Sequence, residues 1–191
     1  ALGLEQTGGL RELRGDDVDP NGGGYKGPRR SGICIRSVCD TFKSTRLRDR
    51  VRARLSVIAA DEGAAKASCI WVVSKKSLAR SALESLNGMM PPDLQFENYQ
   101  DLVAAARAAG VSYIDVARHP RIVITPQSFH WLRRYHAVCD QVFQTPVRMM
   151  VLDEVECIND DLWGATNKLY PQANYMALVW AMWSCGQQPD Q

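Results

Sequence analysis

A regular alternation of short apolar runs with longer helical patterns begins after residue 32 and constrains the fold more than any other feature of this sequence. The apolar runs cover residues 33–37, 68–74, 121–125 and 147–152. Their length and apolar content are typical of β-strands that are buried on both faces. Strands that alternate with helices predict an α/β fold in which a parallel sheet carries helices on both faces.

Helical spacing of apolar residues predicts five helices between and after these runs. They span about 45–60, 77–86, 99–109, 127–138 and 172–184. The apolar residues that recur at helical spacing in the first helix are Leu47, Val51, Leu55 and Ile58. The same helix carries arginine at positions 46, 48, 50, 52 and 54, which form either a solvated face or a docking surface.

The composition is that of one packed domain with flanking segments. With 191 residues, 46% of them hydrophobic, the chain is long enough for a single α/β domain. Residues 1–32 are rich in glycine and charge, so we expect a flexible arm there, a folded lobe over 33–185 and a short tail over 186–191. The net charge of +2 gives no general electrostatic argument for nucleic-acid binding, and no apolar run is long enough to span a membrane.

The cysteines and histidines do not predict a metal site. The six cysteines form no CxxC pair and the chain has three histidines, so a structural zinc site is not expected. Cys34 and Cys69 lie in apolar runs, where a buried reduced thiol is usual. This usage favours an intracellular protein.

Polar residues directly after the apolar runs are the candidate site residues, because ligands of open parallel sheets bind beyond the carboxyl ends of the strands. The fourth run ends in Asp153 and Glu154. A carboxylate in this position can hold Mg²⁺, and a second one can orient an attacking water, as NTP hydrolysis requires. The alternative is an acidic turn after a buried strand.

Lys43 and Ser44 follow the first run and precede the first helix, where a phosphate-binding loop places its lysine and its hydroxyl residue. The segment lacks the glycines that let a backbone wrap around phosphates. Phe42 and Asp40 stand at those positions, and they would crowd and repel a nucleotide. The segment is therefore either a degenerate Walker A motif or a chance Lys-Ser pair.

Hydroxyl and cationic side chains also follow the second and third runs. They are Ser74, Lys75, Thr125 and Ser128. Such groups can bind the phosphate backbone of DNA, with helix N-termini adding N–H donors. The alternative is ordinary helix capping, by Ser74 or Ser77 and by Thr125.

Four segments in a fixed order carry a resemblance to a known family. They are Trp71-Val-Val-Ser-Lys-Lys-Ser-Leu-Ala79, Phe96-Glu-Asn-Tyr99, Ile124-Thr-Pro-Gln-Ser-Phe-His-Trp-Leu-Arg133 and Val151-Leu-Asp-Glu-Val-Glu156. Over about residues 33–185 the chain resembles the helicase lobe of herpesvirus-type replication origin-binding proteins, which are superfamily 2 helicases. The resemblance implies a single RecA-like lobe with ATP and Mg²⁺ as cofactors and DNA as partner.

The resemblance also implies a role for each candidate residue. Lys43 would contact the β- and γ-phosphates, Ser44 and Asp153 would hold Mg²⁺, and Glu154 would support the attacking water. The residues expected along the DNA strand are Ser74, Lys75, Thr125 and Ser128. In motors of this kind a second RecA-like lobe completes the ATP site, so a single lobe is expected to be impaired in catalysis.

Functions of different classes remain open. The first is the ATPase lobe of a DNA helicase, which the Lys-Ser and Asp-Glu pairs favour. The second is a helicase-derived scaffold subunit without catalysis, which Phe42 favours. Its partners would be other protein chains that contact the N-terminal arm and the C-terminal aromatic region, where tryptophan stands at positions 163, 180 and 183. The third is an unrelated α/β binding domain, in which the motifs are coincidence.

Overall fold

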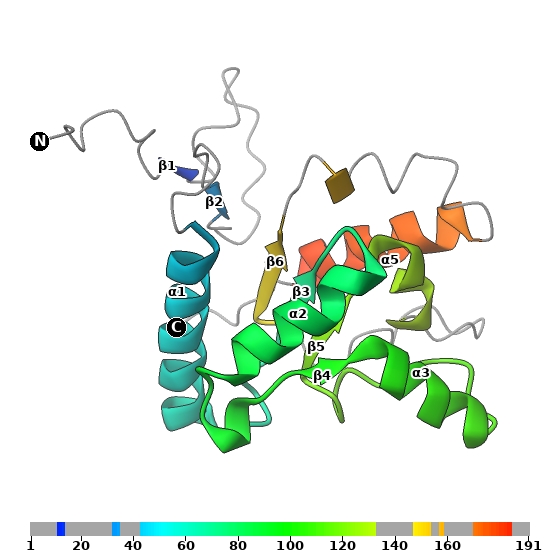
Figure 1. The fold of residues 1–191 in the computed structure, drawn as a ribbon, viewed down its shortest axis with the longest axis horizontal. Helices are drawn as coiled ribbons and strands as arrows, with labels where there is room; N and C mark the ends of the chain where they lie inside the picture. Colours follow the sequence, from blue (N-terminus) through cyan, green and yellow to red (C-terminus); the bar gives the residue numbers. More distant parts are fainter. Residues whose placement is uncertain are drawn as a thin grey trace, which may run out of the picture.

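Four parallel strands form the centre of the fold (Figure 1). They are β3 (Cys69–Val72), β4 (Glu97–Asn98), β5 (Arg121–Ile124) and β6 (Met149–Leu152), in the spatial order β4-β5-β3-β6. The computed structural model describes residues 11–13, 32–34, 43–132, 147–153, 157–158 and 170–184, with side chains over 45–132, 147–153, 157–158, 170–175 and 177–178. The all-parallel sheet confirms the α/β fold that the alternating runs predict.

The inner strands of this sheet are the most apolar ones. Every residue of β3 and β5 is buried, as the near-continuous apolar runs predict. In β6 only Val151 is fully buried, because β6 is an edge strand of the described sheet. Parallel pairing aligns Val72 with Ile124 on one side and with Leu152 on the other, so the three strands end at the same level.

Helices flank the sheet and end near the predicted boundaries. They are α1 (Lys43–Glu62), α2 (Lys76–Asn87), α3 (Tyr99–Ala108) and α5 (Pro171–Ser184), with the 3₁₀ helices η3 (Pro92–Leu94) and η4 (Pro126–Leu132). Figure 1 shows α2 in front of the sheet and α5 behind it. α5 packs against η4, and both α2 and α3 contact β4 and β5. No helix in the described part of the chain is long and apolar enough to cross a membrane.

Capping and packing explain why these helices form where they do. The side chain of Asn98 accepts a hydrogen bond of 2.9 Å from Gln100 N and so caps the start of α3. Gly63, with a φ of 93°, follows the end of α1, where a left-handed residue costs glycine little. The predicted buried side of α1 is confirmed: its core residues are Val51, Leu55 and Ile58, with Leu47 packed against them.

One sequence expectation about secondary structure was wrong, and another was met in part. The run 33–37 was expected to be the first strand of the parallel sheet. Instead β2 (Gly32–Cys34) pairs antiparallel with β1 (Arg11–Leu13) in a separate two-stranded sheet. Arg36 and Ser37 make this run less apolar than β3 or β5, and antiparallel pairs tolerate such one-sided strands better than a buried parallel sheet does. The helix expected over 127–138 is the 3₁₀ helix η4 over its described residues.

Candidate functional site

The predicted site residues that follow β3, β5 and β6 lie at one edge of the sheet, its carboxyl edge. Backbone hydrogen bonds continue the ladder past the strand ends, from Val73 N to Ile124 O (3.0 Å) and from Asp153 N to Val72 O (3.0 Å). Thr125 and Asp153 therefore stand on either side of Val73. This edge is where open parallel sheets bind their ligands.

Thr125 and Ser128 form a buried hydroxyl network at this edge. Thr125 is 0% exposed, and its Oγ1 lies 3.3 Å from Tyr99 Oη and 3.4 Å from Ser128 Oγ. Ser128 N donates to Thr125 O at 3.0 Å, and this hydrogen bond closes the first turn of η4. These hydroxyls thus hold β5, α3 and η4 together and are not presented to solvent.

Lys75 is an exposed cation at the carboxyl edge, and it follows Ser74, which is buried. Lys75 occupies the N-cap position of α2 in an extended conformation, and its own side chain forms no capping hydrogen bond. Neither Ser74 nor Ser77, the residues of the capping alternative, stands at this N-cap position. The first N–H groups of α2 and the exposed Lys75 lie at the same end of this helix, which favours an anion there.

Asp153, the predicted magnesium ligand, is half-buried directly after β6. A carboxylate oxygen is a ligand that Mg²⁺ prefers, and this ion is usually held by one or two carboxylates together with substrate phosphates. The position of Asp153 at the strand end fits that role. Its predicted catalytic neighbour Glu154 lies outside the described residues. Within the described part of the chain, no cluster of three or more His, Cys, Asp or Glu side chains could hold a metal ion.

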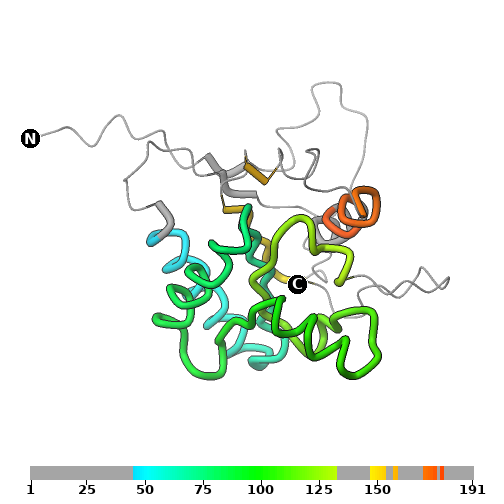
Figure 2. Tube along the Cα trace, turned by 45° about the vertical axis from the view of Figure 1, so that its right-hand side comes forward, coloured from blue at the N-terminus to red at the C-terminus, as the bar shows by residue number. Residues whose placement is uncertain are grey.

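Lys43 and Ser44 are the first two residues of α1, and their side chains lie outside the described set. The opposite end of α1 is fixed at the amino edge of the sheet, because Glu62 forms an ion pair with Arg148 just before β6. A helix of this length rises about 30 Å, about twice the length of a four-residue strand. The start of α1 therefore reaches the side of the molecule on which the carboxyl edge of the sheet lies, as Figures 1 and 2 show. Phe42 and Asp40 lie outside the described residues.

A cluster around His130 is a polar centre that the sequence did not indicate. His130 Nδ1 lies 2.9 Å from Asn174 Oδ1 and 3.1 Å from Gln127 O, and His130 N donates to the same Asn174 Oδ1 at 2.7 Å. Asn174 is buried and donates through Nδ2 to Gln127 O at 3.0 Å. Because its members come from η4 and α5, only the tertiary structure brings them together.

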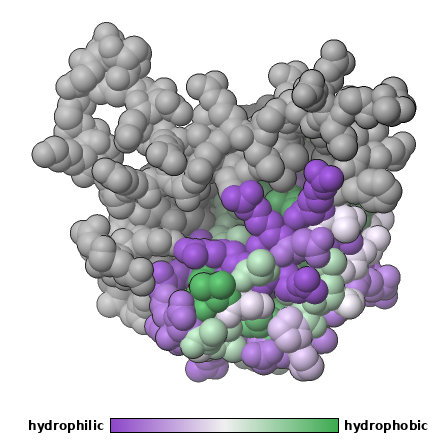
Figure 3. Space-filling view, turned by 90° about the vertical axis from the view of Figure 1, so that its left-hand side faces the viewer, coloured by the Kyte–Doolittle hydropathy of each residue, from purple (hydrophilic) through white to green (hydrophobic). Residues whose placement is uncertain are grey.

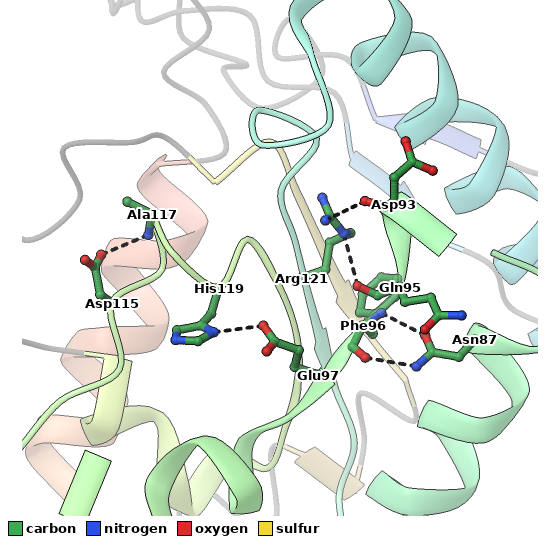
Figure 4. Close-up of polar contacts among 9 residues, drawn as sticks. All are labelled: Asn87, Asp93, Gln95, Phe96, Glu97, Asp115, Ala117, His119 and Arg121. Carbon is green, nitrogen blue, oxygen red and sulfur yellow. Dashed lines mark hydrogen bonds and ion pairs between the residues drawn. The ribbon is translucent and has the colours of Figure 1, made fainter. Parts of the chain in front are cut away.

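Polar contacts at the amino edge of the sheet are structural (Figure 4). Arg121, 8% exposed, donates to four backbone carbonyls. The acceptors are Ala64 O (2.7 Å), Ala67 O (2.9 Å), Asp93 O (2.9 Å) and Gln95 O (3.2 Å). Burial lowers the pKa of Arg121, and the carboxylates of Asp93 and Glu97 oppose this shift. With its donors used in this way, Arg121 ties two segments to β5, the turn before β3 and the η3 segment.

Comparison of the chain with protein-family models, with curated proteins and with solved structures yields no match.

Proposed function

We propose that this chain is a RecA-like lobe of a nucleic-acid-dependent NTPase of the superfamily 2 helicase type. The proposal rests on one observation: the segments after β3, β5 and β6, which carry three of the four resemblances, meet at the carboxyl edge of one parallel sheet. In this proposal Lys75 contacts a phosphate of the DNA strand. The buried hydroxyls of Thr125 and Ser128 shape the edge beneath it.

The nucleotide in this proposal lies between the start of α1 and the end of β6. Lys43 contacts its β- and γ-phosphates, Ser44 and Asp153 hold Mg²⁺, and Glu154 orients the attacking water. Mg²⁺ supplies positive charge that stabilises the phosphate oxygens during transfer. What supports this arrangement is the direction of α1, which brings its N-terminus to the same end of the molecule as Asp153.

A second candidate function is a scaffold subunit of helicase origin that has lost catalysis. One observation favours it: β2, the last described strand before Lys43, pairs with β1 outside the parallel sheet, and all four described strands of the parallel sheet follow α1 in the sequence. In this function the chain binds other protein chains and no nucleotide.

Nucleotide binding separates the two functions. A fluorescent ATP analogue is titrated with Mg²⁺ against the unaltered chain and against the Lys43→Ala and Asp153→Asn variants. The matched controls are Lys66→Ala in the turn before β3 and Asp61→Asn near the end of α1, both exposed and distant from the carboxyl edge. The NTPase lobe predicts at least a tenfold loss of affinity in the first pair and none in the controls. If the unaltered chain does not bind the analogue, the scaffold function is left.

DNA binding tests Lys75 directly. Anisotropy of a labelled single strand is measured at several salt concentrations for Lys75→Ala and for the control Lys66→Ala. Loss of one phosphate contact should lower the slope of log affinity against log salt by about 0.7, with no change for Lys66. If the salt slopes of Lys75→Ala and Lys66→Ala are equal, Lys75 does not contact a DNA phosphate.

A further inference from the structure

We infer that the exposed arginine flank of α1 is a second nucleic-acid-binding surface, which contacts the phosphate backbone through Arg46, Arg50 and Arg54. The inference rests on the proposed function only for the class of ligand. Its residues lie on α1 and not at the carboxyl edge of the sheet, so it can fail or stand separately.

The three arginines share one flank of α1. They are exposed and spaced four residues apart, so each lies about 6 Å further along the same side of the helix. The core residues Val51, Leu55 and Ile58 turn a neighbouring side of the helix inward and leave the arginine flank exposed. Figure 3 views this side of the molecule and shows that hydrophilic side chains make up much of its described surface.

The positive charge of this segment is concentrated and largely unbalanced. Residues 46–54 contain five arginines and one aspartate, a net charge of +4, whereas the whole chain carries +2, so all other residues together carry −2. Asp49 pairs with Arg52 at 3.8 Å, on the other side of the helix. Arg46, Arg50 and Arg54 form no ion pair with any side chain that the structure describes.

This arrangement costs helix stability, since like charges at a spacing of four residues repel one another. A helix face that served only as a solvated surface would gain from an acidic residue among these positions. An external row of negative charges relieves the repulsion instead. The surface therefore fits an anionic ligand outside the chain.

A sugar-phosphate backbone is the anion that fits this row best. It presents negative charges at regular, short intervals, so three arginines in a line can each reach a phosphate. The guanidinium group binds phosphate oxygens through two parallel hydrogen bonds, a geometry that lysine does not offer. An acidic protein surface lacks such a regular row of charges.

The test compares two double variants with the same change in net charge. Arg50→Gln/Arg54→Gln removes two arginines from the flank, and Lys66→Gln/Arg118→Gln removes two exposed cations from turns at the amino edge. Glutamine keeps a high helix propensity, so circular dichroism should show both variants folded. Anisotropy of a labelled DNA duplex, without nucleotide, is measured against salt. The flank variant should lower the salt slope by about 1.8, and the control should leave it unchanged.

Three further measurements identify the chemistry of the ligand. Arg50→Lys/Arg54→Lys should keep the salt slope while weakening binding severalfold, because charge stays and the paired hydrogen bonds are lost. A labelled single strand in place of the duplex shows which form of nucleic acid the flank prefers. Poly-glutamate at an equal concentration of negative charge should not displace the DNA. Displacement by poly-glutamate as effective as that by unlabelled DNA would overturn the phosphate assignment and point to an acidic protein.

The results also separate this surface from the proposed function. If the flank variant weakens duplex binding while Lys75→Ala leaves single-strand binding unchanged, the carboxyl edge loses its role and the α1 surface stands. If Lys75→Ala weakens binding and the flank variant behaves like its control, the α1 surface is overturned and the proposed function stands.

Discussion

Arg148 and Glu62 form an ion pair although 86 positions separate them in the sequence. Glu62 is the last residue of α1, and Arg148 immediately precedes β6. Arg148 also donates from its backbone N to Ser68 Oγ at 2.9 Å, just before β3. This contact joins the end of α1 to the amino edge of the sheet, while Val51, Leu55 and Ile58 bury the preceding turns of α1 in the core.

Replacement of Glu62 by alanine should destabilise the fold by about 1–2 kcal/mol, because a charged hydrogen bond is lost and Arg148 is left in a mostly buried place. The side chain of Arg148 is 12% exposed, against 37% for Glu62. The measurement is urea unfolding followed by circular dichroism. Glu84→Ala, an exposed change on α2, should stay within about 0.5 kcal/mol. Equal effects of the two changes would show that the pair contributes nothing.

Replacement of Arg121 by methionine should be among the most destabilising changes in the chain. The four carbonyls that it binds, from residues 64 to 95, would lose their donor inside the protein. A loss of about 3 kcal/mol or more in the free energy of unfolding is expected. Arg118→Met serves as the control, since the side chain of Arg118 is 83% exposed. A loss of less than 1 kcal/mol at Arg121 would contradict the structural role.

Much of the fold could be predicted from the sequence because periodicity is a local property. The runs that became β3, β5 and β6 are apolar at nearly every position, and the helix boundaries of α1, α2, α3 and α5 follow from spacing and end signals. The strand β4 was missed because its two residues, Glu97 and Asn98, are too few to show a period. The run 33–37 was misplaced because a short apolar run does not reveal its pairing partner.

For Thr125, Lys75 and Asp153 the sequence predicts the edge of the sheet at which they lie but not how exposed their side chains are. Parallel strands place Thr125 and Asp153 at one edge, which the rule for open sheets predicts. That Thr125 is wholly buried while Lys75 is exposed depends on how α3 and η4 pack over the edge. The contacts of His130 with Asn174 depend on the docking of α5, 44 positions away, which no local pattern encodes.

Replacement of Thr125 by valine distinguishes a structural hydroxyl from a DNA-binding one. Valine keeps the shape of threonine but removes the hydroxyl that lies between Tyr99 and Ser128. The free energy of unfolding should fall by about 1 kcal/mol, and the affinity for single-stranded DNA should not change. A DNA affinity that falls as much as in Lys75→Ala, at unchanged stability, would instead assign the hydroxyl to the DNA path.

The protonation of His130 should make stability depend on pH. Its Nδ1 faces two oxygens, Asn174 Oδ1 and Gln127 O, so Nδ1 carries the proton of the neutral ring and Nε2 is the atom that titrates. Burial lowers the pKa of His130 below its ordinary value of 6.5. The hydrogen bonds to Asn174 and Gln127 oppose the shift, and the charge of Arg107 adds to it.

Because the pKa is lower in the folded protein, the unfolded chain binds the proton more readily between the two values. The stabilisation is therefore fully present above about pH 6.5 and is lost as the pH falls through the pKa of the folded state. In urea unfolding series from pH 8 to pH 5, His130→Gln should remove this part of the pH dependence. Arg107→Gln should make the loss smaller and complete it at a higher pH, because the pKa of folded His130 then lies closer to that of the unfolded chain. A pH profile of His130→Gln that overlays that of the unaltered chain would rule His130 out as the titrating group.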